Sequence, residues 1–211
     1  MTIIKDYKTV PILLALILFL NCSPDNQTVK IGNQNWMAEN LSTETFRNGD
    51  KIKHAKTIDE WVTSGKNKQP AWCYYENNST NKKFGKIYNY YAVMDSRGLA
   101  PEGWHIPSVE EWNKLMNHLG GKNIAGSKLK SSSNWKGNLN KDSKNSFNGL
   151  PGGFRDKDGN FNMIGQYTIW WTSTQSFDNE GETREIGFYF EYLEENSRDA
   201  EFGCYIRCIK D

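Results

Sequence analysis

The side chains that could carry acid–base or nucleophilic chemistry are scattered along this chain. Three histidines are present, His54, His105 and His118. None has an acidic or nucleophilic residue at a spacing that would indicate a catalytic site. His105 lies in an apolar stretch that favours a buried structural histidine. Ser173 lacks the Gly-x-Ser-x-Gly frame of a nucleophile elbow. The pair Glu110-Glu111 suits the first turn of a helix, so the sequence predicts no catalytic residue and no cofactor.

The segment Asp156–Asn160 resembles the start of a calcium-binding loop. The sixth position of such a loop should be glycine and is Phe161, and the twelfth should be glutamate and is Tyr167. Asp158-Gly159 is also a strong signal for a hairpin turn. A hairpin therefore explains these residues better than a calcium site, and no metal site is predicted.

Four cysteines are present, at positions 22, 73, 204 and 208. Cys204 and Cys208 lie in a segment that reads as one strand, where four residues span roughly 13 Å. A disulfide needs Cα atoms about 4.4–6.8 Å apart, so these two should not pair, and either could meet Cys73. Three cysteines without a histidine cluster do not make a zinc site.

The N-terminus has the pattern of an export signal. Lys5 and Lys8 precede an apolar run, Val10–Leu20, which is too short for a comfortable membrane span. The run ends at Cys22, as in a bacterial lipoprotein signal, although Asn21 is larger than the small residue usual there. We expect residues 1–21 to be the signal, residues 22–27 a lipidated cysteine and tether, and residues 28–211 the domain. An ordinary secretory signal is the alternative, and an uncleaved anchor is a weaker one.

Composition places the domain among loop-rich, aromatic-rich globular proteins. Aromatic residues make up 13% of the 211 residues, with eight tryptophans, against 37% hydrophobic residues overall. Without its first 22 residues the chain is formally neutral, because that segment holds Lys5, Lys8 and Asp6. A neutral domain offers no electrostatic attraction for nucleic acid, so the lysines of residues 122–144 are expected to be solvated.

Two helices are well specified by their first turns. Ser108 with Glu111, and Thr57 with Glu60, form capping boxes. The stretch Gly103–Trp112 reads as a short buried strand followed by the first of these helices. A smaller helix is expected in the second half of Gly85–Val93, and a single helical turn around Leu129.

Strands are expected on either side of these helices. Gly32-Asn33 predicts a hairpin between residues 28–31 and 34–39. The other predicted strands are residues 71–75, 147–154, 170–173, 186–193 and 204–209, with a turn at 194–198. The fold class is therefore α+β: a single loop-rich domain with a mixed or antiparallel sheet and two main helices.

Several segments together resemble the Fibrobacter succinogenes major paralogous domain, a family of exported bacterial domains. They are Ile31–Leu41, Ala71–Tyr75, Gly85–Val93, Gly103–Ser108 with Glu111-Trp112, Gly152–Arg155, Trp170–Thr174 and Arg207–Asp211. The resemblance implies a disulfide between Cys73 and Cys208, because the recurring cysteines of the family fall there, and leaves Cys204 as a free thiol.

A more distant similarity links the chain to the formylglycine-generating and sulfatase-modifying group, which has a C-type-lectin-like fold. It implies N- and C-terminal strands that lie close together, with long loops on one side. The catalytic cysteine pair of that group is missing, as are the Glu-Pro-Asn and Trp-Asn-Asp signatures of calcium-dependent lectins.

We therefore expect a non-catalytic binding or adhesion module of the cell envelope, lipid-anchored to the outer membrane, for a glycan or an envelope protein. The contact surface should be borne by the loops 136–148, 155–160 and 172–180. The side chains expected to contact ligand are Arg155, Trp171, Asp156 and Asp158. A structural component without a small ligand is the main alternative, and a formylglycine-type enzyme using Cys204 and Cys208 is a weaker one.

Overall fold

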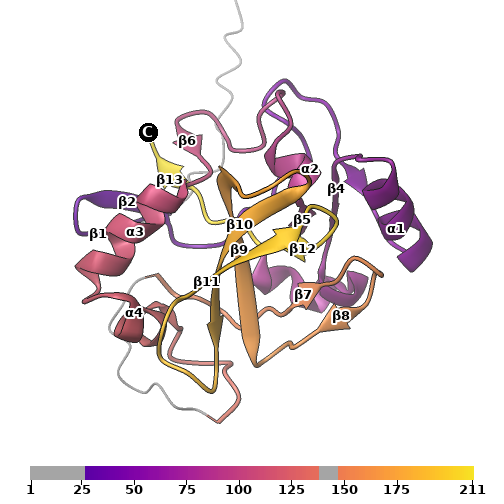
Figure 1. The fold of residues 1–211 in the computed structure, drawn as a ribbon. Helices are drawn as coiled ribbons and strands as arrows, with labels where there is room; N and C mark the ends of the chain where they lie inside the picture. The colour runs from indigo at the N-terminus through magenta and orange to yellow at the C-terminus, as the bar shows by residue number, and fades with distance from the viewer. Residues whose placement is uncertain (1–26, 138–146) are drawn as a thin grey trace, which may run out of the picture.

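A computed structural model describes residues 27–137 and 147–211 (Figure 1). The described chain combines helices with three sheets, which confirms the α+β class. The helices, including two 3-10 turns, are α1 (Ile58–Lys66), η1 (Tyr75–Asn77), η2 (Ser79–Phe84), α2 (Tyr90–Val93), α3 (Val109–His118) and α4 (Lys122–Leu129).

The first sheet brings the two ends of the domain together. It has four strands in the order β1 (Thr28–Ile31), β2 (Gln34–Met37), β13 (Ile209–Lys210) and β6 (Trp104–His105). Ile209 pairs with Trp36 on one side and with His105 on the other. The expectation that N- and C-terminal strands lie close together is confirmed, as is the hairpin at Gly32, where φ is 60°.

The other two sheets carry the segments that matter for a surface site. A six-stranded sheet has the order β3 (Lys53–His54), β4 (Ala71–Cys73), β5 (Ile87–Asn89), β12 (Gly203–Cys204), β7 (Phe154–Arg155) and β8 (Phe161–Asn162). A three-stranded antiparallel sheet has the order β11 (Glu194–Asp199), β10 (Glu180–Gly187) and β9 (Tyr167–Gln175). Figure 1 shows β9, β10 and β11 crossing the middle of the molecule.

Both capping boxes predicted from the sequence are present. Thr57 accepts from the backbone N–H of Glu60 at the start of α1, and Ser108 accepts from that of Glu111 at the start of α3. Each glutamate returns a bond to the backbone of its cap residue. Two backbone N–H groups that would otherwise lack an acceptor are thereby satisfied at each helix start. The local sequence therefore sets where α1 and α3 begin.

Aromatic side chains fill the core in two clusters. The first contains Trp36, Trp112, Trp170 and Phe147, with ring centroids 4.9 Å apart for Trp36 and Trp112. The second contains Trp72, Tyr88, Tyr90 and Trp171. The tryptophans expected in the core, Trp36, Trp104, Trp112 and Trp170, are all buried. Tilted and edge-on rings of this kind add to the stabilisation that comes from burial.

Several elements differ from the sequence-based predictions. The strand expected over 147–154 is reduced to β7, because Pro151 has no N–H and Gly153 adopts a φ of 71°. The single turn expected at Leu129 is the eight-residue helix α4. The strand expected over 204–209 divides into β12 and β13, which belong to different sheets.

The strand expected over residues 186–193 ends at Gly187, and the turn expected over 194–198 is strand β11. The alternating aromatic residues Phe188, Phe190 and Tyr192 lie instead in the loop between β10 and β11. A Cβ at Gly187 would lie 2.5 Å from the Phe190 ring, so the missing side chain makes room for that ring. Tertiary packing therefore overrides the period-two pattern here.

Candidate functional site

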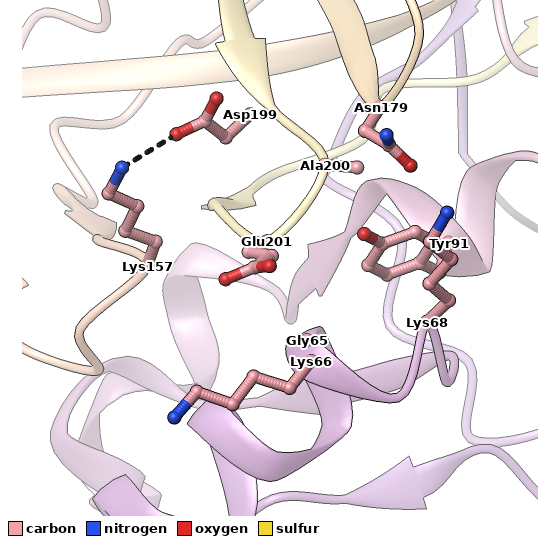
Figure 2. Close-up of a pocket in the computed structure, with 9 residues that line it drawn as sticks. All are labelled: Gly65, Lys66, Lys68, Tyr91, Lys157, Asn179, Asp199, Ala200 and Glu201. Carbon is pink, nitrogen blue, oxygen red and sulfur yellow. Dashed lines mark hydrogen bonds and ion pairs between the residues drawn. The ribbon is translucent and has the colours of Figure 1, made fainter.

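A surface pocket of about 260 Å³ lies where several loops meet (Figure 2). Its residues come from the end of α1 and just beyond it, from α2, from the β7–β8 and β9–β10 turns, and from the end of β11 with the two residues that follow. They are Gly65, Lys66, Lys68, Tyr91, Lys157, Asn179, Asp199, Ala200 and Glu201. The loops predicted at 155–160 and 172–180 each supply one residue, Lys157 and Asn179.

Backbone and packing contacts hold the floor of this pocket. The indole N–H of Trp61 donates to the carbonyl of Glu201 over 3.1 Å. A Cβ at Gly65 would lie 3.0 Å from Glu201 Cγ, so glycine at this position allows Glu201 to pack on α1. The backbone N–H of Tyr90 donates to the carbonyl of Ala200 over 2.9 Å, and the backbone N–H of Ala200 donates to the carbonyl of Asn179 over 2.7 Å. Elements distant in sequence are thereby fixed around one space.

The charged groups of the pocket are only partly paired. Lys157 and Asp199 form an ion pair of 3.1 Å, and the bond to Asp199 raises the pKa of Lys157. Lys66 and Lys68 are exposed and form no ion pair within the described residues. Burial, and then the charge of Glu201, raise the pKa of the Tyr91 phenol, which therefore stays protonated at neutral pH.

The pocket presents several polar groups that have no partner within the described residues. Its free donors and acceptors are two ammonium groups, a carboxylate, an amide and a phenol, all of which can bond hydroxyl, amide or carboxylate groups of a ligand. Figure 2 shows Tyr91, Asn179 and Lys68 on one side and the Lys157–Asp199 pair on the other. None of its nine residues is a cysteine, serine or histidine that could serve as a nucleophile.

Arg155 and Trp171, two of the expected ligand contacts, are buried in the core, so neither reaches a ligand at the surface. Arg155 is 1% exposed and donates to the carbonyls of Gly159, Ala55 and Thr57. The Trp171 side chain is fully buried, and its indole donates to the Tyr88 carbonyl over 2.8 Å. Both residues hold elements together, Arg155 joining the β7–β8 hairpin to the start of α1.

The two aspartates proposed beside them lie in the β7–β8 turn. Asp156 accepts from the Asn160 N–H over 2.8 Å and from the Asn162 amide over 3.1 Å. Asp158 is exposed, and Gly159 has a φ of 88°. The hairpin is thus confirmed. Across residues 27–137 and 147–211, no three His, Cys, Asp or Glu side chains are placed to hold a metal ion.

The disulfide expected between Cys73 and Cys208 is not formed, and the three cysteines of the described chain are free buried thiols. Cys73 belongs to the first core cluster, whereas Cys204 and Cys208 belong to the second. Cys73 therefore packs in a different cluster from Cys208. Burial raises the pKa of Cys73 and of Cys208 to about 12 and that of Cys204 well above its usual range.

Those raised pKa values also bear on the enzyme hypothesis. Cys204 and Cys208 are fully buried, so substrate cannot approach either sulfur. The thiolate is the nucleophile and metal ligand in cysteine chemistry, and burial keeps both groups protonated. The structure therefore gives no support to formylglycine-type chemistry at this pair.

His105 has two acidic partners that sequence spacing did not reveal. Its Nε2 lies 2.8 Å from Glu111 Oε1, and its Nδ1 lies 2.6 Å from Asp211 Oδ1. Glu111 comes from the capping box of α3, whereas Asp211 arrives through the pairing of β13 with β6. The side chain is 40% exposed, so the expectation of a buried histidine is wrong. Only the strand pairing could have shown this cluster.

We expect the His105 cluster to stabilise the fold more at low pH than at high pH. Partial burial lowers the pKa of His105, but its bonds to Glu111 and Asp211 outweigh burial, and the net shift is upward from 6.5. The contribution should be complete below pH ~6.5 and lost as the pH rises through the folded-state value. Solvent screening keeps it below about 1 kcal/mol.

Thermal unfolding of wild type and His105→Gln between pH 5 and 9 would measure this contribution. The wild-type advantage should be largest at pH 5 and shrink towards pH 9, and Asp211→Asn should reduce it. A constant difference across the range would contradict the assignment.

The predicted N-terminal signal and the predicted lipid attachment at Cys22 concern residues 1–26, which lie outside the described residues. Most of the loop predicted at 136–148 also lies outside the described residues, since residues 138–146 are not described. In the part of the chain that is described, no helix has the length and apolar character needed to cross a membrane.

Comparison with known proteins gives one clear result. No curated protein and no solved structure matches this chain, so a C-type-lectin-like fold stays a prediction. The family model of the Fibrobacter succinogenes major domain matches residues 29–210. This range runs from the second residue of β1 to the end of β13. The chain therefore belongs to the Fibrobacter succinogenes major domain family.

Proposed function

We propose that this protein is a non-catalytic binding module of the bacterial cell envelope, and that its pocket takes an acidic glycan. The observation that carries the proposal is the convergence of unpaired polar groups in that pocket. Lys66, Lys68, Asn179 and Glu201 come from three segments distant in sequence. Side chains that stabilised only the fold would be expected to bond one another.

The charge of the pocket favours a ligand with a carboxylate. Lys157 and Asp199 neutralise each other, which leaves two ammonium groups against the single carboxylate of Glu201. One anionic group on the ligand would balance this excess. Glu201, Asn179 and Tyr91 then remain to bond hydroxyl groups, which both donate and accept hydrogen bonds. A volume of about 260 Å³ suits a single sugar ring more than a long chain.

Export and anchoring complete the proposal. A signal over residues 1–21 with lipid on Cys22 would place the domain at the outer membrane, where glycans and envelope proteins are accessible. No nucleic acid is proposed as a partner, because the domain is formally neutral.

Calorimetric titration of the purified protein with uronic acid oligosaccharides would test the pocket. Replacing Lys68 with methionine should weaken binding about tenfold or more, since a bond to a charged group contributes roughly 1.5–3 kcal/mol. The matched control is Lys114→Met, an exposed lysine on α3 away from the pocket, which should bind as wild type does.

Binding should also weaken as salt is raised, because exposed charges are screened. Absence of binding to every uronic acid oligosaccharide, or equal affinity of the Lys68 and Lys114 variants, would refute the proposal.

A structural role in an envelope assembly is the second candidate, and one observation favours it. Phe177, in the β9–β10 turn next to Asn179, is 72% exposed. An exposed aromatic ring is a common anchor in protein interfaces. Cross-linking in intact cells should then trap a partner through this turn, whereas recovery of monomer alone would count against it.

A further inference from the structure

A second exposed aromatic surface lies at the other end of the β10–β11 ribbon. The loop between these strands contains Phe188, Tyr189, Phe190 and Tyr192, here called the aromatic loop. Tyr189 is 62% exposed and Tyr192 is 39% exposed. Asn179 of the pocket precedes β10, and eight residues of strand separate the two sites by about 25 Å. The aromatic loop is therefore distinct from the pocket.

Backbone bonds hold the aromatic loop in one conformation. The N–H of Ser127 donates to the carbonyl of Glu191 over 2.8 Å, and the N–H of Leu193 donates to Lys122 over 2.9 Å. The buried ammonium of Lys130 donates to the Phe190 carbonyl over 2.6 Å. A Cβ at Gly126 would lie 2.0 Å from the Tyr192 carbonyl oxygen, so α4 and the loop are in close contact. A ligand would meet a surface that is already ordered, which lowers the entropic cost of binding.

The rings support one another in fixed orientations. Phe190 and Tyr192 stack with centroids 4.2 Å apart and planes at 17°. Tyr189 stands nearly perpendicular to Phe190, at 4.9 Å and 79°. Tyrosine combines an apolar ring with a hydroxyl group that can bond a polar partner. The loop thus offers ring faces and edges together with two hydroxyl groups.

The two exposed rings alone are too small to form a stable protein interface. Aromatic side chains bury about 150–250 Å² each when covered, so the exposed fractions of Tyr189 and Tyr192 together offer roughly 150–250 Å². A stable protein interface needs about 800 Å² on each partner. The exposed area suits one or two sugar rings.

The charge around the loop points to a neutral ligand. Lys136 lies 5.7 Å from the Phe188 ring centroid, and Glu191 is exposed within the loop itself. These charges are opposite in sign, and Lys130 is already engaged with a carbonyl group. A single-stranded nucleic acid would need a positively charged groove beside the rings, and the loop has none within the described residues.

We infer that the aromatic loop is a binding site for neutral glycan chains, separate from the acidic-glycan pocket. The C–H face of a neutral pyranose ring would stack on Tyr189 or Tyr192, and its hydroxyl groups would bond the phenols and the charged groups at the edge. A pyranose ring has both features that this surface requires, an apolar face and a rim of hydroxyl groups.

Titration of the purified protein with cellohexaose and maltohexaose, two neutral oligosaccharides, tests this inference. At least one should bind, and Tyr189→Ala should weaken that binding about tenfold or more. Tyr189→Phe keeps the ring and should stay within about threefold of wild type. Circular dichroism and thermal unfolding would show that both variants are folded, and Tyr189 is exposed enough for its replacement to be tolerated.

The outcomes separate this inference from the proposed function. Loss of uronic acid binding in Lys68→Met, with neutral binding unaffected by Tyr189→Ala, would overturn the inference and leave the pocket intact. Neutral binding lost only in Tyr189→Ala would support the inference whatever the pocket does. Failure of both neutral hexasaccharides to bind, or concentration-dependent self-association that Tyr189→Ala abolishes, would overturn it.

Discussion

Replacing Arg207 with methionine is expected to lower the free energy of unfolding by roughly 3–5 kcal/mol. Arg207 is 1% exposed and donates to four acceptors, the side chain of Asn40 and the carbonyls of Met37, Ala38 and Phe147. Its guanidinium also lies 4.5 Å from the Phe147 ring centroid. One side chain therefore joins the end of β2, the segment at Phe147 and the approach to β13.

Two effects oppose each other in this variant. Burial lowers the pKa of Arg207 to about 9, which shows that the fold pays to hold the charge. Methionine would remove that cost. It would also take a donor from three backbone carbonyls, at about 1–3 kcal/mol for each one left unsatisfied, whereas the Asn40 amide oxygen keeps its bond from the Trp170 indole. The unsatisfied acceptors should outweigh the relief, because the backbone groups cannot be removed.

Thermal and urea unfolding would measure the loss. A domain of this size should melt roughly 6–20 °C lower for 3–5 kcal/mol. The matched control is Arg97→Met, because Arg97 is more than a third exposed and pairs with Asp95 and Asp50 at the surface. That variant should lose less than about 1 kcal/mol. Equal melting temperatures for the two variants would contradict the role given to Arg207.

Local signals in the sequence predicted the parts of the fold that depend on near neighbours. Each capping box needs only residues three positions apart, and both helices begin where Thr57 and Ser108 predict. The Asp158-Gly159 hairpin is equally local. The distant similarity to the formylglycine-generating group added the closeness of the N- and C-terminal strands, which no local pattern shows and which the pairing of β2 with β13 confirms.

Sequence patterns failed where packing decides which way a side chain faces. Arg155 and Trp171 have the residue types common in binding sites, yet both are buried in this fold. Cys73 and Cys208 lie in different core clusters, a fact that spacing along the chain cannot reveal. The strand boundary at Gly187 depends on a ring that occupies the space of a missing side chain.

The sequence predicted two of the loops that line the pocket, but it did not predict which residues would meet there. Lys157 and Asn179 lie in two of the predicted loops, because turns between strands are usually exposed. Lys66 is the last residue of α1 and Lys68 follows it, and this end of the helix meets Glu201 only through packing at Gly65. Long-range contacts of this kind have no signal in a single sequence.

Replacing Glu185 with alanine is the second change expected to have a large effect, at roughly 3–5 kcal/mol. Glu185 is fully buried on β10. It accepts two bonds from Arg198, of 2.9 and 2.8 Å, one from the Thr183 hydroxyl and one from the Tyr167 hydroxyl. Alanine would leave the partly buried Arg198 without its carboxylate. It would also remove one of two acceptors from each hydroxyl, because Thr183 keeps the Asn196 carbonyl and Tyr167 keeps Glu194.

The Tyr167 hydroxyl is a reliable donor in this cluster. Burial, followed by the charge of Glu185, raises the pKa of Tyr167, so its phenol stays protonated. The same hydroxyl also bonds Glu194 of β11. The cluster therefore connects all three strands of the sheet, and its loss should destabilise β9 and β11 as well as β10.

Urea unfolding of Glu185→Ala, Arg198→Met and the double variant would separate the pair from its surroundings. Each single variant removes one side of the same ion pair, so the double variant should lose clearly less than the sum of the two. The control is Lys122→Met, which breaks an exposed ion pair of 2.6 Å with Glu195 and should cost less than about 1 kcal/mol. If the two losses simply add, Glu185 and Arg198 act independently, and the large cost of Glu185→Ala must come from Thr183 and Tyr167 alone.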